Sequence, residues 1–232
     1  MKKRAFNLIS ALLNLLTVIF VAESVIYNFR SDIIRVELVG GGFGWGCFKY
    51  FTVLSNVFCA VVAAVCLYFN ARNVVGDEFV FPRFLKTVKA TSTVAVSLTM
   101  LTVVFFLGPY AAFLGKSYFA LFERNNLFLH LLCPMLAIIA QMVEVSEKRP
   151  FVEVMFALIP TFLYEIVYTV MVVFVRGWKD FYGFTFGGHF GLTPVAIVVM
   201  LGVTFGIAAV EKLIFDKFAA RHSDLIQNEE KE

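Results

Sequence analysis

Residues 5–27 read AFNLISALLNLLTVIFVAESVIY, an apolar run with few polar side chains. A helix needs about 20 apolar residues to cross the hydrocarbon core of a bilayer. The apolar region of a secretory signal is only roughly 7–15 residues long. This run also lacks a convincing small-x-small cleavage site. We therefore expect a retained membrane helix over about residues 5–28.

Five further apolar runs follow the first, at about residues 48–69, 88–107, 127–143, 152–175 and 192–214. The chain is 60% hydrophobic and 16% charged, against roughly 25% charged residues in a soluble domain. The runs lack the alternation of barrel strands, and a helix satisfies its own backbone in lipid. The sequence therefore predicts an all-α integral membrane bundle of six helices. This single transmembrane domain occupies residues 1–232 and ends in a charged cytoplasmic tail over 221–232.

The placement of basic residues predicts that both termini are cytoplasmic. With the N-terminus inside, 13 of the 20 Lys and Arg residues fall in cytoplasmic segments, Lys89 among them, and seven fall outside. Retained basic residues set membrane topology, so N-in/C-in is favoured. The net charge is only +3 and there is no long basic block, which argues against a nucleic-acid partner.

Cysteine, glycine and histidine patterns indicate no metal or cofactor site. The four cysteines form no C-x-x-C pair, and three lie inside apolar runs, where thiols act as small hydrophobic groups. Residues 40–46, GGGFGWG, do not match a dinucleotide-binding motif, and we expect an outer loop with Trp45 as an interface anchor. The histidines lack metal-ligand spacing, and His189 is expected to be solvated.

Polar side chains within a span are costly and normally face the bundle interior. In this topology the ionisable ones gather toward the outer half of the bilayer. On the second span, polar and small residues recur at spacings of three and four, which predicts one shared helical face: Lys49, Thr52, Asn56, Cys59, Ala63 and Cys66. The opposite face carries Phe51, Leu54 and Phe58.

The fourth and fifth spans add a second set of polar residues. Pro134 follows His130 by four residues and cannot donate a backbone hydrogen bond to the His130 carbonyl, so the helix should be loosened there. On the fifth span, one face is predicted to carry Thr161, Glu165, Tyr168 and Arg176. Glu165 lies near mid-membrane and must be neutral or paired.

The helix directions place Thr52, Asn56, His130, Tyr168 and Arg176 in the same leaflet. A hydroxyl nucleophile needs a base, and a neutral histidine is the usual partner, so Thr52 and His130 form a candidate catalytic pair. In supporting roles, Asn56 or Lys49 would stabilise an oxyanion, and Glu165 or Tyr168 would orient the imidazole. The alternative is that these groups only complete helix packing through local and interhelical hydrogen bonds.

The residues around this pair resemble a known family. The segment 48–56, FKYFTVLSN, is similar to the stretch that carries the nucleophilic threonine in the androgen-induced-gene family of intramembrane lipid hydrolases. Residues 126–134, NLFLHLLCP, resemble the histidine-proline span of the bacterial six-span relatives. A third block, residues 164–184, resembles the family in Tyr168, Arg176-Gly177 and Tyr182-Gly183-Phe184. It departs at residues 178–182, WKDFY, where relatives tend toward a proline-aromatic-proline run.

The resemblance implies a metal-independent esterase of the bacterial cytoplasmic membrane. Thr52 would be the nucleophile and His130 the base, with no cofactor and a membrane lipid or fatty-acyl ester as substrate. A small-solute or ion permease is the second hypothesis, suggested by Glu165, Arg176 and the Ser/Thr-rich third span. The third is a non-catalytic membrane scaffold.

Overall fold

The computed structural model describes residues 2–30, 44–76, 81–144 and 147–229, and this part of the chain is helical without any strand. Six helical segments are long and apolar enough to cross a membrane: Arg4–Phe29, Phe51–Val75, Arg83–Phe113, Asn125–Glu144, Val152–Phe174 and Phe190–Ala220. The prediction of an all-helical protein with six long apolar helices is confirmed. These helices fit a multi-pass membrane protein.

The first two spans are single helices, α1 (Lys2–Arg30) and α2 (Phe51–Val75), and the short 3-10 helix η2 (Gly44–Lys49) precedes α2. The third and fourth spans are composite. The third comprises α3 (Arg83–Thr102), η3 (Val103–Leu107) and α4 (Gly108–Phe113), followed by the turn η4 (Tyr118–Phe122). The fourth comprises α5 (Asn125–Leu127), η5 (Phe128–Leu132) and α6 (Cys133–Glu144).

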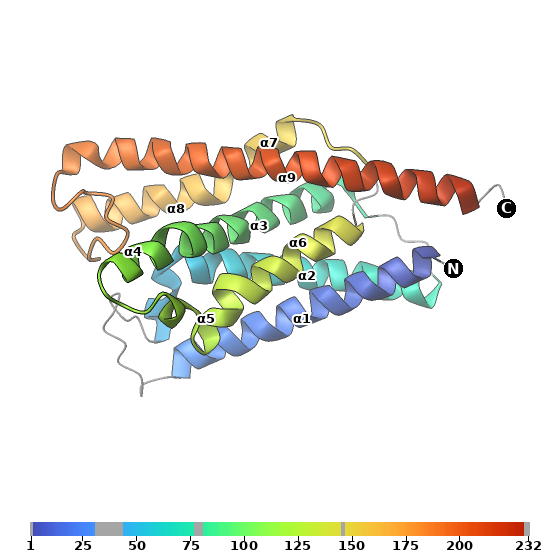
Figure 1. Cartoon of the computed structure of the whole chain (residues 1–232), viewed down its shortest axis with the longest axis horizontal. Coiled ribbons are helices and arrows are strands. Elements are labelled where there is room, and N and C mark those ends of the chain that lie inside the picture. The colour runs from blue at the N-terminus through green and yellow to red at the C-terminus, as the bar shows by residue number, and fades with distance from the viewer. Residues whose placement is uncertain (1, 31–43, 77–80, 145–146, 230–232) are drawn as a thin grey trace.

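The fifth span comprises α7 (Val152–Phe156), α8 (Ile159–Thr169) and η6 (Val170–Phe174). The sixth comprises η7 (Phe190–Leu192) and α9 (Thr193–Glu229). Helix α9 runs past the predicted end of its span at residue 214, so most of the expected tail over 221–232 has helical backbone. Because six spans return the chain to its starting side, both termini lie at one end of the bundle (Figure 1). We call this the terminal end and the opposite one the far end.

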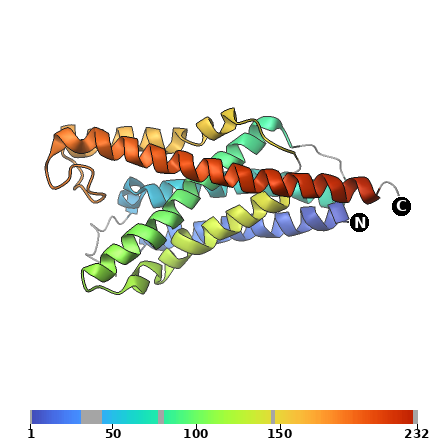
Figure 2. The same ribbon diagram turned by 45° about the horizontal axis from the view of Figure 1, so that its top comes forward.

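Helix α3 lies at the centre of the bundle, and the third span is the most deeply buried of the six. It packs against α2, α6 and α9, while α1 packs against α2 and α6 and α8 packs against α9 (Figures 1 and 2). The hydroxyl side chains of α3 therefore point into the protein, and Ser92, Thr93 and Ser97 are each only 1% exposed. Leu, Val and Phe side chains cover the outside of the bundle, as expected where the solvent is lipid.

Each of the third, fourth and fifth spans contains a five-residue π-helical segment: η3, η5 and η6. A π-helical turn hydrogen-bonds to the fifth residue ahead, and such turns occur often at functional sites. In η5 the Cys133 amide donates to the Phe128 carbonyl. The predicted loosening of the helix around His130 and Pro134 is confirmed, and it takes the form of this π-helical turn.

Candidate functional site

Helix α2 begins later than the sequence spacing suggested. Tyr50 has extended backbone angles, φ −92° and ψ 133°, and caps a helix that starts at Phe51. Lys49 therefore belongs to η2, and its predicted place on the polar face of the second span is wrong. Its ammonium lies 5.1 Å from the Tyr50 ring centroid and 5.7 Å from that of Phe181, a cation–π arrangement. Burial, and then repulsion by Lys179, lowers the pKa of Lys49.

Of the remaining positions on the predicted polar face of α2, Thr52 is half-buried and the other four are confirmed as buried. Asn56 and Cys66 are fully buried, Cys59 and Ala63 are 4% exposed, and Leu54 on the other side is exposed. The Asn56 amide donates to the Thr52 carbonyl at 2.8 Å and to the Leu129 carbonyl of η5 at 3.0 Å. Asn56 thereby joins the turn of α2 that carries Thr52 to the residue preceding His130.

Proline explains why the Leu129 carbonyl is free to accept from another helix. In a π-helical turn it would receive the amide proton of residue 134, but proline has no N–H. Asn56 supplies the missing donor, since a buried carbonyl without a partner is costly. The sequence signal for this contact is therefore the combination of Pro134 with a buried amide on the neighbouring span.

The His130 ring contacts the turn that precedes its own span. Its Nδ1 lies 2.6 Å from the Leu121 carbonyl oxygen, and its ring meets Phe122 edge-on at a centroid distance of 6.5 Å. A carbonyl only accepts, so Nδ1 carries the proton and the lone pair resides on Nε2. Within the described residues, no hydrogen bond joins the Thr52 side chain to His130.

Thr52 instead lies in a tyrosine cluster formed with α8 and the loop after η6. The Tyr182 hydroxyl accepts the Phe51 amide proton at 3.1 Å and lies close to the side chains of Tyr164 and Thr52. The Tyr164 hydroxyl donates to the Lys49 carbonyl at 2.7 Å. Burial raises the pKa of Tyr182 to about 12, so its hydroxyl stays protonated and can donate. Composition and spacing gave no sign of this role for Tyr182.

Asp180 holds the loop over this cluster. Its carboxylate accepts hydrogen bonds from the Tyr168 hydroxyl at 2.8 Å, the Phe184 amide at 2.9 Å, and the Thr185 amide and hydroxyl at 2.7 and 2.6 Å. Burial alone would raise the pKa of Asp180, but these hydrogen bonds hold it below its ordinary value.

Three polar residues predicted on the fifth span do not contact His130 in the structure. Tyr168 is fully buried, and its hydroxyl donates to Asp180, so it does not orient the imidazole. Glu165 is 1% exposed, and neither carboxyl oxygen has a hydrogen-bond partner among the described residues, so it is not paired there and it does not orient the imidazole. Arg176 lies beyond the end of η6 with a left-handed φ of 55° and is exposed, so the prediction that it shares a helical face with Thr161, Glu165 and Tyr168 is wrong.

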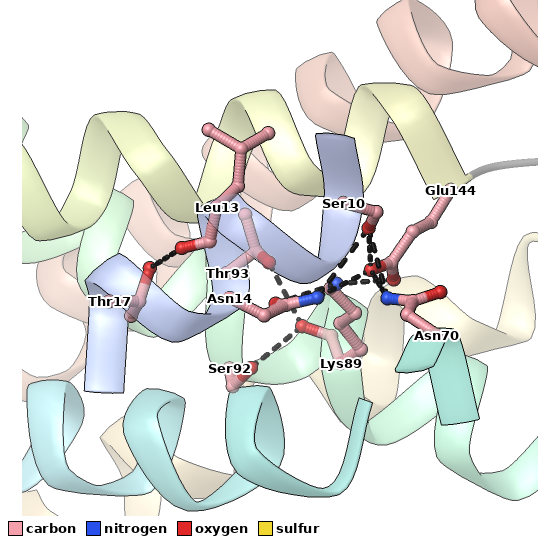
Figure 3. A network of polar contacts seen from close by, with 9 residues as sticks. All are labelled: Ser10, Leu13, Asn14, Thr17, Asn70, Lys89, Ser92, Thr93 and Glu144. Carbon is pink, nitrogen blue, oxygen red and sulfur yellow. Dashed lines mark hydrogen bonds and ion pairs between the residues drawn. The ribbon is translucent and has the colours of Figure 1, made fainter. Parts of the chain in front are cut away.

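A second polar cluster lies toward the terminal end and was not predicted. The Glu144 Oε1 atom accepts from Ser10, from Asn14 at 2.6 Å and from Asn70 at 2.8 Å, while Oε2 pairs with Lys89 (Figure 3). These residues come from α1, α2, α3 and α6, and the Lys89 and Glu144 side chains are 7% and 11% exposed. We call Ser10, Asn14, Asn70, Lys89 and Glu144 the inner network.

The inner network corrects two expectations. The predicted topology counts Lys89 in a cytoplasmic connection, whereas the residue lies inside α3, six residues or about 9 Å from the start of the helix. Buried ionisable groups therefore do not gather only near the far end. The sequence did contain a sign of this cluster, since Asn70 follows Cys66 by four residues and extends the polar face of α2 by one more turn.

The remaining expectations concern cysteines and histidines. All four cysteines are buried and free, which fits their role as small hydrophobic groups. His189 and Trp45 are exposed, as expected, and residues 40–43 of the glycine-rich segment lie outside the described residues. Within the described ranges, no three His, Cys, Asp or Glu side chains gather as metal ligands. Comparison with family models, curated proteins and solved structures gave no match.

Proposed function

We propose that the protein is a metal-independent intramembrane esterase related to the androgen-induced-gene lipid hydrolases. The observation that carries this proposal is the Asn56 bridge, which holds the turn bearing Thr52 against the turn bearing His130. The substrate is a fatty-acyl ester that enters laterally from the bilayer. In this reading both termini are cytoplasmic, and the far end of the bundle lies in the outer leaflet.

The reaction uses Thr52 as nucleophile and His130 as base. The Thr52 hydroxyl oxygen attacks the ester carbonyl while Nε2 of His130 takes its proton, and His130 then returns the proton to the departing alcohol. Water next attacks the acyl-threonine, with its proton passing through His130, and the fatty acid is released. Because the two side chains form no mutual hydrogen bond at rest, substrate must draw them together, as apo sites often require.

The surroundings of both residues support these roles. The Leu121 carbonyl fixes the histidine tautomer whose Nε2 can accept a proton. The Tyr182 hydroxyl, which lies close to the Thr52 side chain, can donate a hydrogen bond where the oxyanion would form. It takes over the part that sequence reasoning gave to Lys49. Asn56 acts through the backbone of both turns and is a positioning residue.

Activity-based labelling tests the pair. Purified protein in detergent is treated with a fluorophosphonate probe, and the labelled residue is mapped by mass spectrometry. We expect Thr52→Ala and His130→Ala to abolish labelling and Thr52→Ser to retain it. The matched controls are Thr93→Ala, a buried threonine of α3, and the exposed His189→Ala, both of which should label normally. Undiminished labelling of Thr52→Ala and His130→Ala would refute the proposal.

A small-solute or ion permease is the second candidate, favoured by the burial of polar groups along α3. Thr91, Ser92, Thr93, Ser97 and Thr99 all lie inside the bundle, and Glu165 lies buried on α8. Such groups can line a pathway between spans. Flux of a solute into proteoliposomes that falls in the Glu165→Ala variant would support this function, whereas absent or unchanged flux would exclude that role for Glu165.

A further inference from the structure

A small cavity adjoins the inner network on its far side. It has a volume of about 10 Å³, and its wall includes polar groups of Asn14, Thr17, Lys89, Ser92 and Thr93 together with Cys59 and Ala63. This is close to the smallest space that holds one water molecule, and a buried water needs two to four polar partners. The size excludes any larger solute.

The hydrogen bonds of Lys89 leave one donor for this cavity. The ammonium group has three N–H bonds. One N–H points to the Glu144 carboxylate, and one points to the side-chain amide oxygen of Asn14 at 3.2 Å. No described protein atom is assigned to the third. A buried charged donor without an acceptor is costly, so an acceptor in the cavity would stabilise the network.

The hydroxyl groups around the cavity offer acceptors. Thr17 donates its proton to the Leu13 carbonyl at 2.9 Å, and Ser92 and Thr93 donate theirs to the Lys89 carbonyl at 2.8 and 3.0 Å (Figure 3). Each of these oxygens therefore keeps lone pairs. The cavity thus combines one strong donor with several acceptors, which matches a ligand that both accepts and donates.

We propose that this cavity is a binding site for a single water molecule, which accepts the third Lys89 proton and donates to the surrounding hydroxyl oxygens. A monovalent metal ion has the wrong charge beside an ammonium group. Water can accept from the ammonium group and donate to the hydroxyl oxygens. It completes the coordination of Lys89 and links the ion pair of α3 and α6 to the hydroxyl group of Thr17 on α1.

A substitution that fills the cavity tests the proposal, because the proposal predicts whether thermal stability falls or rises. Ala63→Val places two methyl groups in the wall and displaces the water. In the wild-type background we expect thermal stability in detergent to fall by about 2–8 °C, because Lys89 loses an acceptor. In a Lys89→Met/Glu144→Gln background the ammonium is absent, so Ala63→Val should lower the melting temperature by less, or raise it. Ala63→Ser, whose hydroxyl can replace the water as acceptor, should be milder than Ala63→Val.

The comparison of backgrounds removes simple overpacking, which would lower stability in both. Equal effects of Ala63→Val in the two backgrounds would overturn the proposal, as would a stability gain in the wild type. If the double variant does not fold, a nanodisc structure at a resolution that shows ordered water decides the matter. Density at hydrogen-bonding distance from the Lys89 ammonium supports the site, and an empty cavity refutes it. Neither result depends on esterase activity.

Discussion

Glu144→Gln is the sharpest test of the inner network, because it removes one charge and little else. Three neutral donors, Ser10, Asn14 and Asn70, all contact Oε1, whereas Lys89 pairs with Oε2. The amide oxygen of glutamine can keep the three neutral hydrogen bonds. The new NH₂ group faces the ammonium, so the substitution leaves a buried charge without its counter-ion.

The expected loss is about 3 kcal/mol, since breaking a buried ion pair costs about 3–5 kcal/mol. That corresponds to roughly a hundredfold change in the unfolding equilibrium. The exposed pair between Lys86 and Glu147 at 2.7 Å provides a matched control. Glu147→Gln should cost less than about 1 kcal/mol, as exposed pairs do.

Unfolding in mixed micelles of increasing SDS content, followed by circular dichroism, measures these free energies. The double variant Lys89→Met/Glu144→Gln should recover much of the loss, because it removes both charges together. The reasoning fails if Glu144→Gln is no worse than Glu147→Gln. It fails equally if the losses from Lys89→Met and Glu144→Gln simply add.

Three further tests address other parts of the molecule. Because the folded-state pKa of Asp180 is lowered, the carboxylate stabilises the loop fully above the ordinary pKa of 3.8, and this stabilisation is lost as pH falls through the folded-state pKa. Trp178 fluorescence in a Trp45→Phe background should follow this change. The Asp180→Asn substitution should abolish the pH dependence. Gly108→Ala would place a methyl group inside the van der Waals radius of the Tyr118 ring, so we expect a loss of about 1–3 kcal/mol in SDS unfolding. Gly46→Ala meets no atom within 4 Å and should be neutral. Asn56→Ala strips the Leu129 carbonyl of its donor and should cost about 1–3 kcal/mol in the same assay, and a neutral result would contradict the bridge.

The span pattern was readable from the sequence because the bilayer sets a simple length requirement. A run such as 152–175 must be helical to satisfy its own backbone in lipid, whatever lies beside it. The polar face of α2 was readable for a related reason, since Asn56, Cys59 and Ala63 follow the helical repeat and polar groups avoid lipid. Local geometry also sufficed for the loosened turn before Pro134.

The candidate site was only partly readable, because helical spacing assumes an uninterrupted helix. The late start of α2 removed Lys49 from its predicted face, and η6 ended the regular repeat before Arg176. The side-chain partners of His130 and Tyr168, a backbone carbonyl and a loop carboxylate, come from segments whose approach depends on packing. Spacing along one helix carries no information about such partners.

The sequence by itself determined six helices, their order and the burial of polar groups, because apolar length and helical periodicity are local properties of the chain. Only the tertiary structure decided which of those groups meet. Lys89 and Glu144 are 55 residues apart, and each alone is consistent with a hydrated helix end. Their burial as a pair follows from the packing of α1, α2, α3 and α6 around them, which encloses both charges with the polar partners that make burial tolerable.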